Sequence, residues 1–205
     1  VTLQSAIELI TTFALKCSEK IFRPHFESLI KWSKLVHEYD AESDELMEKK
    51  IAMLQILNSL IGKLGRFGIN YYGHVFDYFV GFMSHCEDKL KHLSSGGETG
   101  KRASSAPSAR FIEIHGLIMH SLKLLFSNDR KGFIDPLKFE QLIKPLASQV
   151  ALPGLSENFP LYVETVIAPV IVELAETVSD DFMWKTIVHQ VCSHLRTAKV
   201  LRSEE

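Results

Sequence analysis

The amino-acid sequence predicts an all-α protein, an α-solenoid in which antiparallel helix pairs stack side by side. Apolar residues recur at the period of a helix, about 3.6 residues, in nearly every segment. No segment shows sustained β alternation with hairpin turns. The pattern Phe-Glu-x-Leu-Ile-Lys occurs at residues 26–31 and again at 139–144. Such a recurrence is expected where repeated units pack against their neighbours in the same way.

The apolar period places about eight helices along the chain. In the second helix the apolar stripe includes Phe26, Leu29 and Ile30, and Pro24 fits the first turn, where its missing N–H is not needed. The expected helices are 2–16, 22–37, 43–65, 68–92, 108–127, 135–151, 156–178 and 180–196.

The helix expected at 68–92 is unusually aromatic. Exposed rings could stack on nucleic-acid bases, but no Lys or Arg is interleaved between residues 67 and 88. A helix that is apolar on nearly all sides is more simply buried, so we expect a central core helix and keep base stacking as the alternative. The aromatic residues are Phe67, Tyr71, Tyr72, Phe76, Tyr78, Phe79 and Phe82.

The stretch 94–109 interrupts the helical pattern. Gly, Ser and Pro dominate it and no apolar stripe survives, so we expect a mobile polar linker. It separates two helix pairs in residues 1–93 from two more in residues 110–205, which should stack on the first half as a right-handed superhelix. Each pair then has roughly 40 to 50 residues, the unit length of HEAT-like arrays.

The later helices carry their own start signals and two interior prolines. Asp135 should cap the helix at 135–151. Pro145 and Pro169 stand inside helical runs, and an interior proline costs about 3 kcal/mol and usually bends a helix. In the last helix, Asp180 and Asp181 supply a cap and a favourable N-terminal charge. Its expected apolar stripe is Met183, Ile187, Val191 and Leu195.

Composition limits the class of protein. Hydrophobic residues make up 46% and charged residues 23% of the 205 residues, as in globular proteins with a core. A net charge of −2 argues against a surface built mainly to neutralise phosphates. The widely spaced Cys17, Cys86 and Cys192 suggest a reducing compartment without a disulfide framework. No apolar run approaches the roughly 18 residues of a membrane span, so we expect neither a signal peptide nor a membrane partner.

Metal and nucleophile chemistry have weak candidates. His189, Cys192 and His194 are near neighbours, and Cys86 follows a histidine, but on a helix position 194 is turned away from 189 and 192. We therefore expect a buried cysteine beside surface histidines, and no metal or other cofactor. The cysteines lie in or at the ends of helical stripes, and the hydrolase, phosphate-loop and zinc-protease motifs are absent. We expect no enzyme activity and no small-molecule substrate.

Three stretches, taken together, resemble one family. FRPHFESLIKW at 22–32, PLKFEQLIKPLASQV at 136–150 and TVIAPVIVELAETVSDDFMWKTIVHQV at 165–191 follow its motifs in order. The resemblance is to the C-terminal region of the large nucleolar HEAT-repeat scaffold of the small-subunit processome, in its transcription-coupled subcomplex. His25 and Ser28 depart from its apolar positions. The matching residues are Phe22, Arg23, Pro24, Phe26, Leu29, Trp32, Pro145, Pro169, Asp180, Asp181, Trp184 and Lys185.

The resemblance implies a non-catalytic scaffold of ribosome biogenesis, located in the nucleus and nucleolus. It would support processome assembly on nascent pre-ribosomal RNA, small-subunit rRNA processing and rDNA transcription, with other processome proteins as partners. Most matching residues would then serve capping, packing and repeat geometry. A direct contact with pre-rRNA or small nucleolar RNA through a basic patch is the alternative. The residues expected to face a partner are Arg23, Lys31, Lys34, Lys185, Arg196, Lys199 and Arg202.

Overall fold

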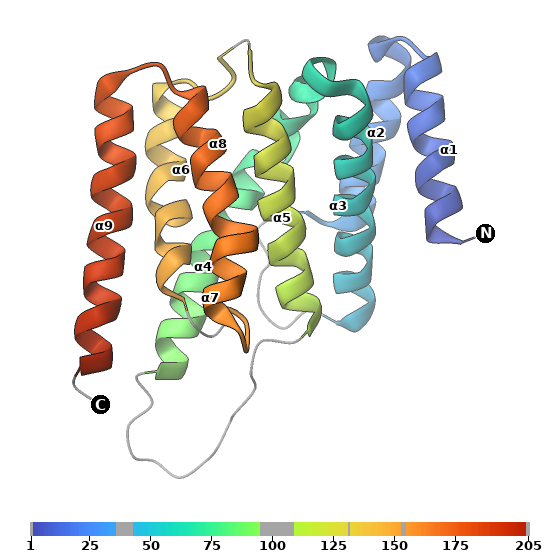
Figure 1. Cartoon of the computed structure of the whole chain (residues 1–205). Coiled ribbons are helices and arrows are strands. Elements are labelled where there is room, and N and C mark those ends of the chain that lie inside the picture. The colour runs from blue at the N-terminus through green and yellow to red at the C-terminus, as the bar shows by residue number, and fades with distance from the viewer. Residues whose placement is uncertain (1, 36–42, 95–108, 131, 153–154, 204–205) are drawn as a thin grey trace.

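A computed structural model describes residues 2–35, 43–94, 109–130, 132–152 and 155–203, and every regular element within these ranges is helical (Figure 1). The all-α prediction is confirmed. The expected linker at 94–109 lies outside the described residues except for its two ends, Ser94 and Ala109. Within the described ranges no helix is both long and apolar enough to cross a membrane.

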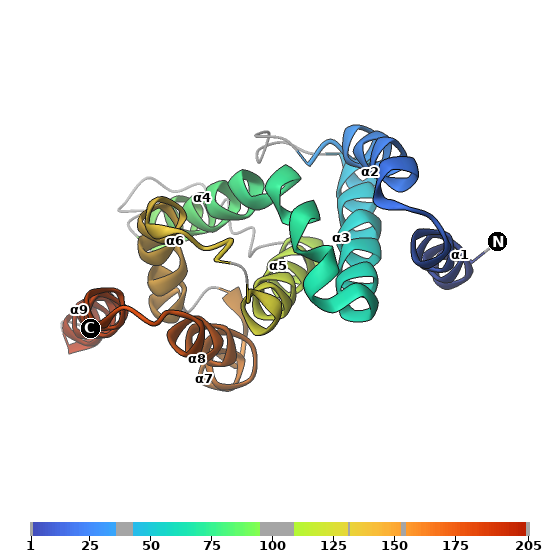
Figure 2. The same cartoon turned by 90° about the horizontal axis from the view of Figure 1, so that it is seen from above.

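The helices form two rows that run across the molecule (Figure 2). The first row consists of α1 (Leu3–Lys16), α3 (Asp44–Leu64), α5 (Ala109–Asn128) and α8 (Ala168–Thr177). The second row consists of α2 (Glu19–Ser33), α4 (Phe76–Ser94), α6 (Pro136–Ser148) and α9 (Asp181–Ser203).

Packing follows these rows. α3 packs against α1, α2 and α5, and α5 packs against α8. In the other row, α6 lies between α4 and α9. Consecutive long helices run in opposite directions (Figure 1). This is the predicted stack of antiparallel pairs, while the hand of the superhelix and the two-half domain division stay predictions.

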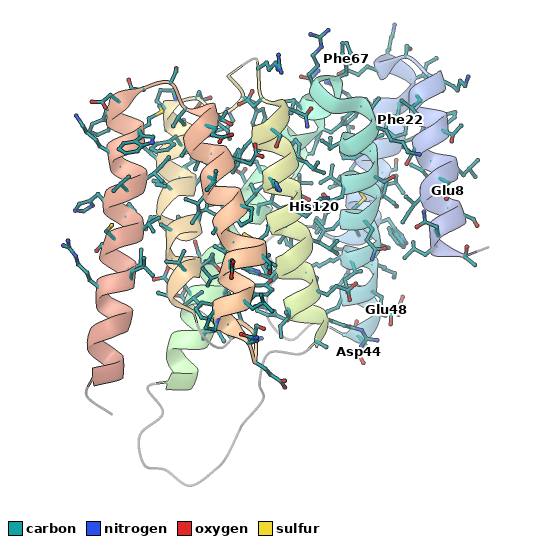
Figure 3. The ribbon with its side chains drawn as sticks, viewed as in Figure 1. Glu8, Phe22, Asp44, Glu48, Phe67 and His120 are labelled. Atoms are coloured by element: carbon teal, nitrogen blue, oxygen red, sulfur yellow. The ribbon has the colours of Figure 1, made fainter. Side chains whose placement is uncertain are left out.

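The aromatic segment lies in the core but is not one helix. A 3-10 helix, η1 (Gly65–His74), precedes α4, which begins only at Phe76. Gly65 has φ +53°, a left-handed conformation that glycine adopts without strain, and its N–H donates to the carbonyl of Ile61 to close α3. The prediction of one continuous helix at 68–92 is therefore wrong at its start. Most of its rings are buried as predicted, but Phe67 is 66% exposed, at the top edge of the molecule in Figure 3.

Pro24 is not in the first turn of its helix, contrary to the expectation. The N–H groups of Ile21 and Phe22 both donate to the carbonyl of Ser18 at 3.0 Å, so α2 begins at Glu19 and the proline lies inside it. The proline removes one backbone donor within the helix. Ser28 Oγ donates to the Pro24 carbonyl at 2.9 Å, which is the ordinary back-bond of a helical serine and does not replace that donor.

The expected continuous helix at 156–178 is also interrupted. A short α7 (Phe159–Tyr162) leads into a π-helical turn, η4 (Val163–Ile167), and Pro169 stands in the first turn of α8. A proline has no N–H to donate and its ring crowds the preceding turn. The wider π turn accommodates it there, with the Ala168 N–H reaching the carbonyl of Val163. Pro145, in contrast, lies inside α6 as expected.

Candidate functional site

The cations expected to face a partner fall into two separate groups. Arg23, Lys31 and Lys34 are exposed residues of the α2 segment, and Lys185 and Arg196 are exposed on α9. α2 and α9 lie toward opposite ends of the second row (Figure 2). The structure therefore does not bring the two groups into one site. Lys199 and Arg202 belong to the helical backbone of α9, but their side chains lie outside the described residues.

Two of these cations form ion pairs within their own helix. An Arg23 guanidinium nitrogen lies 2.7 Å from a carboxylate oxygen of Glu19, and Lys185 Nζ lies 2.6 Å from Asp181. Both pairs are largely exposed, and exposed pairs at this spacing are held weakly. Each cation can therefore exchange its carboxylate for one on a partner at small cost.

The last helix begins at a well-formed cap. Asp180 Oδ1 accepts from the N–H groups of Phe182 and Met183, at 2.7 and 3.1 Å. Ile187 is buried against the core, with Met183 and Val191 packed beside it. Met183, Ile187 and Val191 therefore pack on the core as expected, whereas Leu195 does not.

Beside this buried side, α9 exposes a second apolar stripe. Trp184 is 50%, Val188 43% and Leu195 48% exposed, which corrects the buried position expected for Leu195. The structural role expected for Trp184 stays a prediction. Basic and polar side chains adjoin the stripe, and the two kinds together line a shallow hollow. We call this surface the α9 face and define it as Trp184, Lys185, Val188, Cys192, Leu195 and Arg196.

A second candidate surface is the groove between α1 and α2. Its walls include Ile10, Phe13 and Leu29, and its floor is the buried Phe22 (Figure 3). The ring of His25 lies edge-on to Phe13, with centroids 5.6 Å apart. The groove is apolar and lies at the N-terminal end of the stack. The partly exposed side chains of this region include Leu9, Phe13 and Trp32. The structural role expected for Trp32 stays a prediction.

The metal and nucleophile candidates separate in space. Cys86 is buried as expected, and burial raises the pKa of its thiol, which keeps it protonated and unreactive. Cys192 is exposed, so the expectation of a buried cysteine between His189 and His194 is wrong. Within the described ranges, no group of three or more His, Cys, Asp or Glu side chains is placed to hold a metal ion.

A buried polar network that the sequence did not reveal lies in the middle of the stack. His115 on α5 is fully buried, its Nδ1 lies 2.7 Å from Tyr162 Oη and its Nε2 lies 3.1 Å from Gln149 Oε1. Gln149 Nε2 donates to the carbonyls of Met83 and Pro145, which leaves Oε1 as an acceptor only. His115 Nε2 therefore carries the proton and Nδ1 accepts from the tyrosine.

Burial fixes the charge of this network. It lowers the pKa of His115 to about 4 and raises the pKa of Tyr162, so both groups are neutral near pH 7. With His115 enclosed, the network joins α4, α5, α6 and α7 rather than forming an open catalytic site. A histidine and a glutamine within apolar stripes were the sequence signals that could have indicated it.

Polar contacts also join α3 to α5. Ser121 Oγ donates to Asn58 Oδ1, and Asn58 Nδ2 donates to the Leu117 carbonyl at 3.1 Å. Arg110, at the start of α5, lies 2.6 Å from carboxylate oxygens of both Asp44 and Glu48. These two carboxylates lie at the start of α3 (Figure 3). These contacts position α5 along α3. They therefore help to set how the helices at the two ends of the stack, which bear the two exposed surfaces, are arranged.

Comparison with known proteins shows what the chain is similar to. A family model described as the BP28CT (NUC211) domain matches residues 2–134, from α1 through α5. The U3 small nucleolar RNA-associated protein 10 of Schizosaccharomyces pombe is 25% identical over 196 residues, which are 95% of this chain and 10% of that protein. No solved structure matches.

Two further relatives carry the HEAT-repeat description. HEAT repeat-containing protein 1 of Homo sapiens is 24% identical over 186 residues, 90% of this chain and 8% of the relative. The homologue of that protein in Dictyostelium discoideum is 35% identical over 81 residues, 39% of this chain and 4% of the relative. The chain thus spans a tenth or less of the length of these three relatives.

Proposed function

The chain belongs to the BP28CT (NUC211) domain family, and from this premise we propose that it is a non-catalytic interaction segment of ribosome biogenesis that acts within the small-subunit processome. Relatives that align with nearly the whole chain include a protein named for its association with U3 small nucleolar RNA. By that relationship, the segment works in the nucleolus, as part of a much longer scaffold. Its partners are other protein subunits of the same complex.

The observation that supports an interaction role best is the exposed apolar surface at both ends of the stack. Large apolar side chains of α1 and α2, such as Leu9 and Trp32, are about half exposed or more, as are those of the α9 face. An ordinary monomer leaves such residues scattered rather than gathered on its terminal helices. Stacked helix pairs bind partners over extended surfaces of this kind.

The finer proposals concern the stage of assembly. The segment would help build the early complex on nascent pre-ribosomal RNA, and so support small-subunit rRNA processing and rDNA transcription. We propose that its two rows of helices act as a spacer with an interaction surface at each end. Such a segment contributes by holding proteins at fixed separation, not by chemistry of its own.

Direct RNA binding is a second candidate, favoured by one observation. From Phe182 to Ser203 the last helix carries four Lys or Arg residues and no Asp or Glu. Phosphate contacts would make binding steeply salt-dependent, because each contact releases about one counterion. A titration of pre-ribosomal RNA against the whole chain at several salt concentrations decides it, and a log–log slope near zero excludes RNA contact.

The central test measures association with U3 small nucleolar RNA. The tagged chain is expressed in cells and immunoprecipitated, and the recovered U3 RNA is compared with spliceosomal small nuclear RNAs as the matched control. We expect enrichment of U3 over the control RNAs and nucleolar fluorescence of the tagged chain. Equal recovery of both RNA classes by a folded chain would contradict the proposed function.

A further inference from the structure

The α9 face combines an apolar stripe with a basic edge on a single straight helix. Trp184, Val188 and Leu195 follow one another at i, i+4 and i+11, so they form a line about 16 Å long at 1.5 Å per residue. Their exposed fractions lie between 43% and 50%, so about half of each side chain is already seated against the protein. The stripe is therefore anchored and does not need to be ordered by a ligand.

From Lys185 onward the charge beside the stripe is positive. Lys185 and Arg196 adjoin the apolar line, and after Asp181 the described part of α9 carries no acidic residue. Lys185 is paired with Asp181 only through an exposed contact within the helix. For Arg196 no ion pair is formed with another described residue. A partner that covers the stripe meets a positive edge and is best matched by carboxylates.

We propose that the α9 face is a docking site for an amphipathic helix of another protein subunit, whose apolar side covers Trp184, Val188 and Leu195 and whose acidic flank faces Lys185 and Arg196. This inference deepens the proposed function and rests on it. A helix fits because the stripe is straight and runs along a helix axis, where i±4 ridges offer the usual groove for a second helix. α6 already packs against another side of α9.

RNA fits the same surface less well. Two of the three stripe residues are aliphatic, and Val188 and Leu195 offer no ring on which a base can stack. The central part of the face also has few cations for its length, since among the side chains that the structure describes Lys185 and Arg196 are the two that adjoin the stripe. Carboxylates on a folded helix satisfy both cations while the apolar side chains are covered.

The first experiment measures binding of the whole 205-residue chain to designed peptides. In a Trp32→Phe background Trp184 is the remaining tryptophan, and its emission reports burial of the stripe. One probe is an amphipathic helix flanked by Glu, the second replaces each Glu by Lys, and the third scrambles the apolar order. We expect a blue shift with the Glu peptide, binding at least about tenfold weaker with the Lys peptide, and none with the scramble.

Variants distinguish specific binding at the α9 face from non-specific hydrophobic binding. Val188→Glu should weaken binding of the Glu peptide by about tenfold or more, because it places a carboxylate within the apolar stripe. Arg196→Glu should shift the preference toward the Lys peptide, which a merely structural role would not do. Val172→Glu, the same change at an exposed valine of α8 outside both candidate surfaces, should leave binding unchanged. Equal binding of the Glu and Lys peptides overturns the proposal.

The second experiment identifies the natural occupant in the assembled complex. A photo-crosslinker is attached to the exposed Cys192 in a Cys17→Ser variant, in which the buried Cys86 is the other remaining thiol. A crosslink to an amphipathic helix with an acidic flank in another protein supports the proposal. A crosslink to RNA, to a second copy or to another part of the parent chain overturns it.

The two proposals fail in different ways. If the chain does not enrich U3 small nucleolar RNA, the proposed function is wrong, whatever the peptides show. If U3 enrichment persists but the Glu peptide shows no preference over the Lys peptide, only the docking inference is wrong.

Discussion

The two copies of Phe-Glu-x-Leu-Ile-Lys stand in α2 and α6, two helices of the same row with different surroundings. In α6, Phe139, Leu142 and Ile143 are all buried. In α2, Phe26 is equally buried, but the Leu-Ile pair that follows is only partly buried against the core. α6 lies between α4 and α9, whereas α2 belongs to the terminal pair and packs mainly on α3. The same local pattern therefore forms a helix in both places, but the helices packed around it determine how much of its apolar surface is buried.

The largest expected effect tests what the two copies share. Phe26→Ala and Phe139→Ala should each lower the free energy of unfolding by about 3–5 kcal/mol, because both rings are fully enclosed. Urea unfolding followed by far-UV circular dichroism measures both. A much smaller loss for Phe26 would show that the terminal pair is looser than its burial indicates.

The leucines test what the two copies do not share. Leu142→Ala should cost about 2–5 kcal/mol, since it opens a cavity in a closed core. Leu29→Ala should cost about 1 kcal/mol, because the site is already partly open to water. The same unfolding measurement applies to both variants. Equal losses would contradict the distinction between the terminal and inner copies.

The buried histidine of the inner region should make stability depend on pH. The pKa of His115 is lowered to about 4 in the folded chain, from its ordinary value of 6.5, so the unfolded chain binds more protons between these values. The His115 contribution is fully present above pH 6.5 and falls as the pH decreases toward 4, by about 3 kcal/mol in all. Unfolding free energies across this range measure the slope.

Two variants check the source of that slope. His115→Asn removes the titrating group, so the part of the slope due to it should disappear. Tyr162→Phe keeps the histidine and removes one hydrogen bond, so it should cost about 1 kcal/mol near neutral pH and retain the slope. An unchanged slope in His115→Asn would assign the pH dependence to other groups.

The smallest expected effect concerns the exposed ion pair of the terminal region. Arg23→Gln removes the contact with Glu19 and should change the unfolding free energy by no more than about 0.5 kcal/mol. If Arg23 binds a partner, the same variant should weaken complex formation while leaving stability unchanged. A stability loss above about 1 kcal/mol, on the scale of a buried contact, would instead give Arg23 a packing role.

The helices and their order were predictable because apolar periodicity and caps are local signals. Asp135, expected as a cap, does accept from the Lys138 N–H at 2.8 Å. Exposure at the ends of a stack depends on which helices pack nearby, and local sequence does not indicate this. Trp32 and Trp184 look like core residues in the sequence, although no described helix covers them fully. The Tyr162–His115 contact joins residues 47 positions apart, a separation that periodicity cannot reveal.

The π turn before Pro169 has a consequence for how this sequence can change. A π turn holds one residue more than an α turn, so it absorbs an extra residue that would otherwise rotate the following helix by about 100°. Tyr162 meets His115 before the turn, and Val170 and Leu174 point into the core after it. Deleting a single residue from 163–167 would restore a regular α-helix and leave both sets near their present phase. Inserting a residue there would rotate one of the two sets toward solvent, so the more damaging small edit in this segment is an insertion.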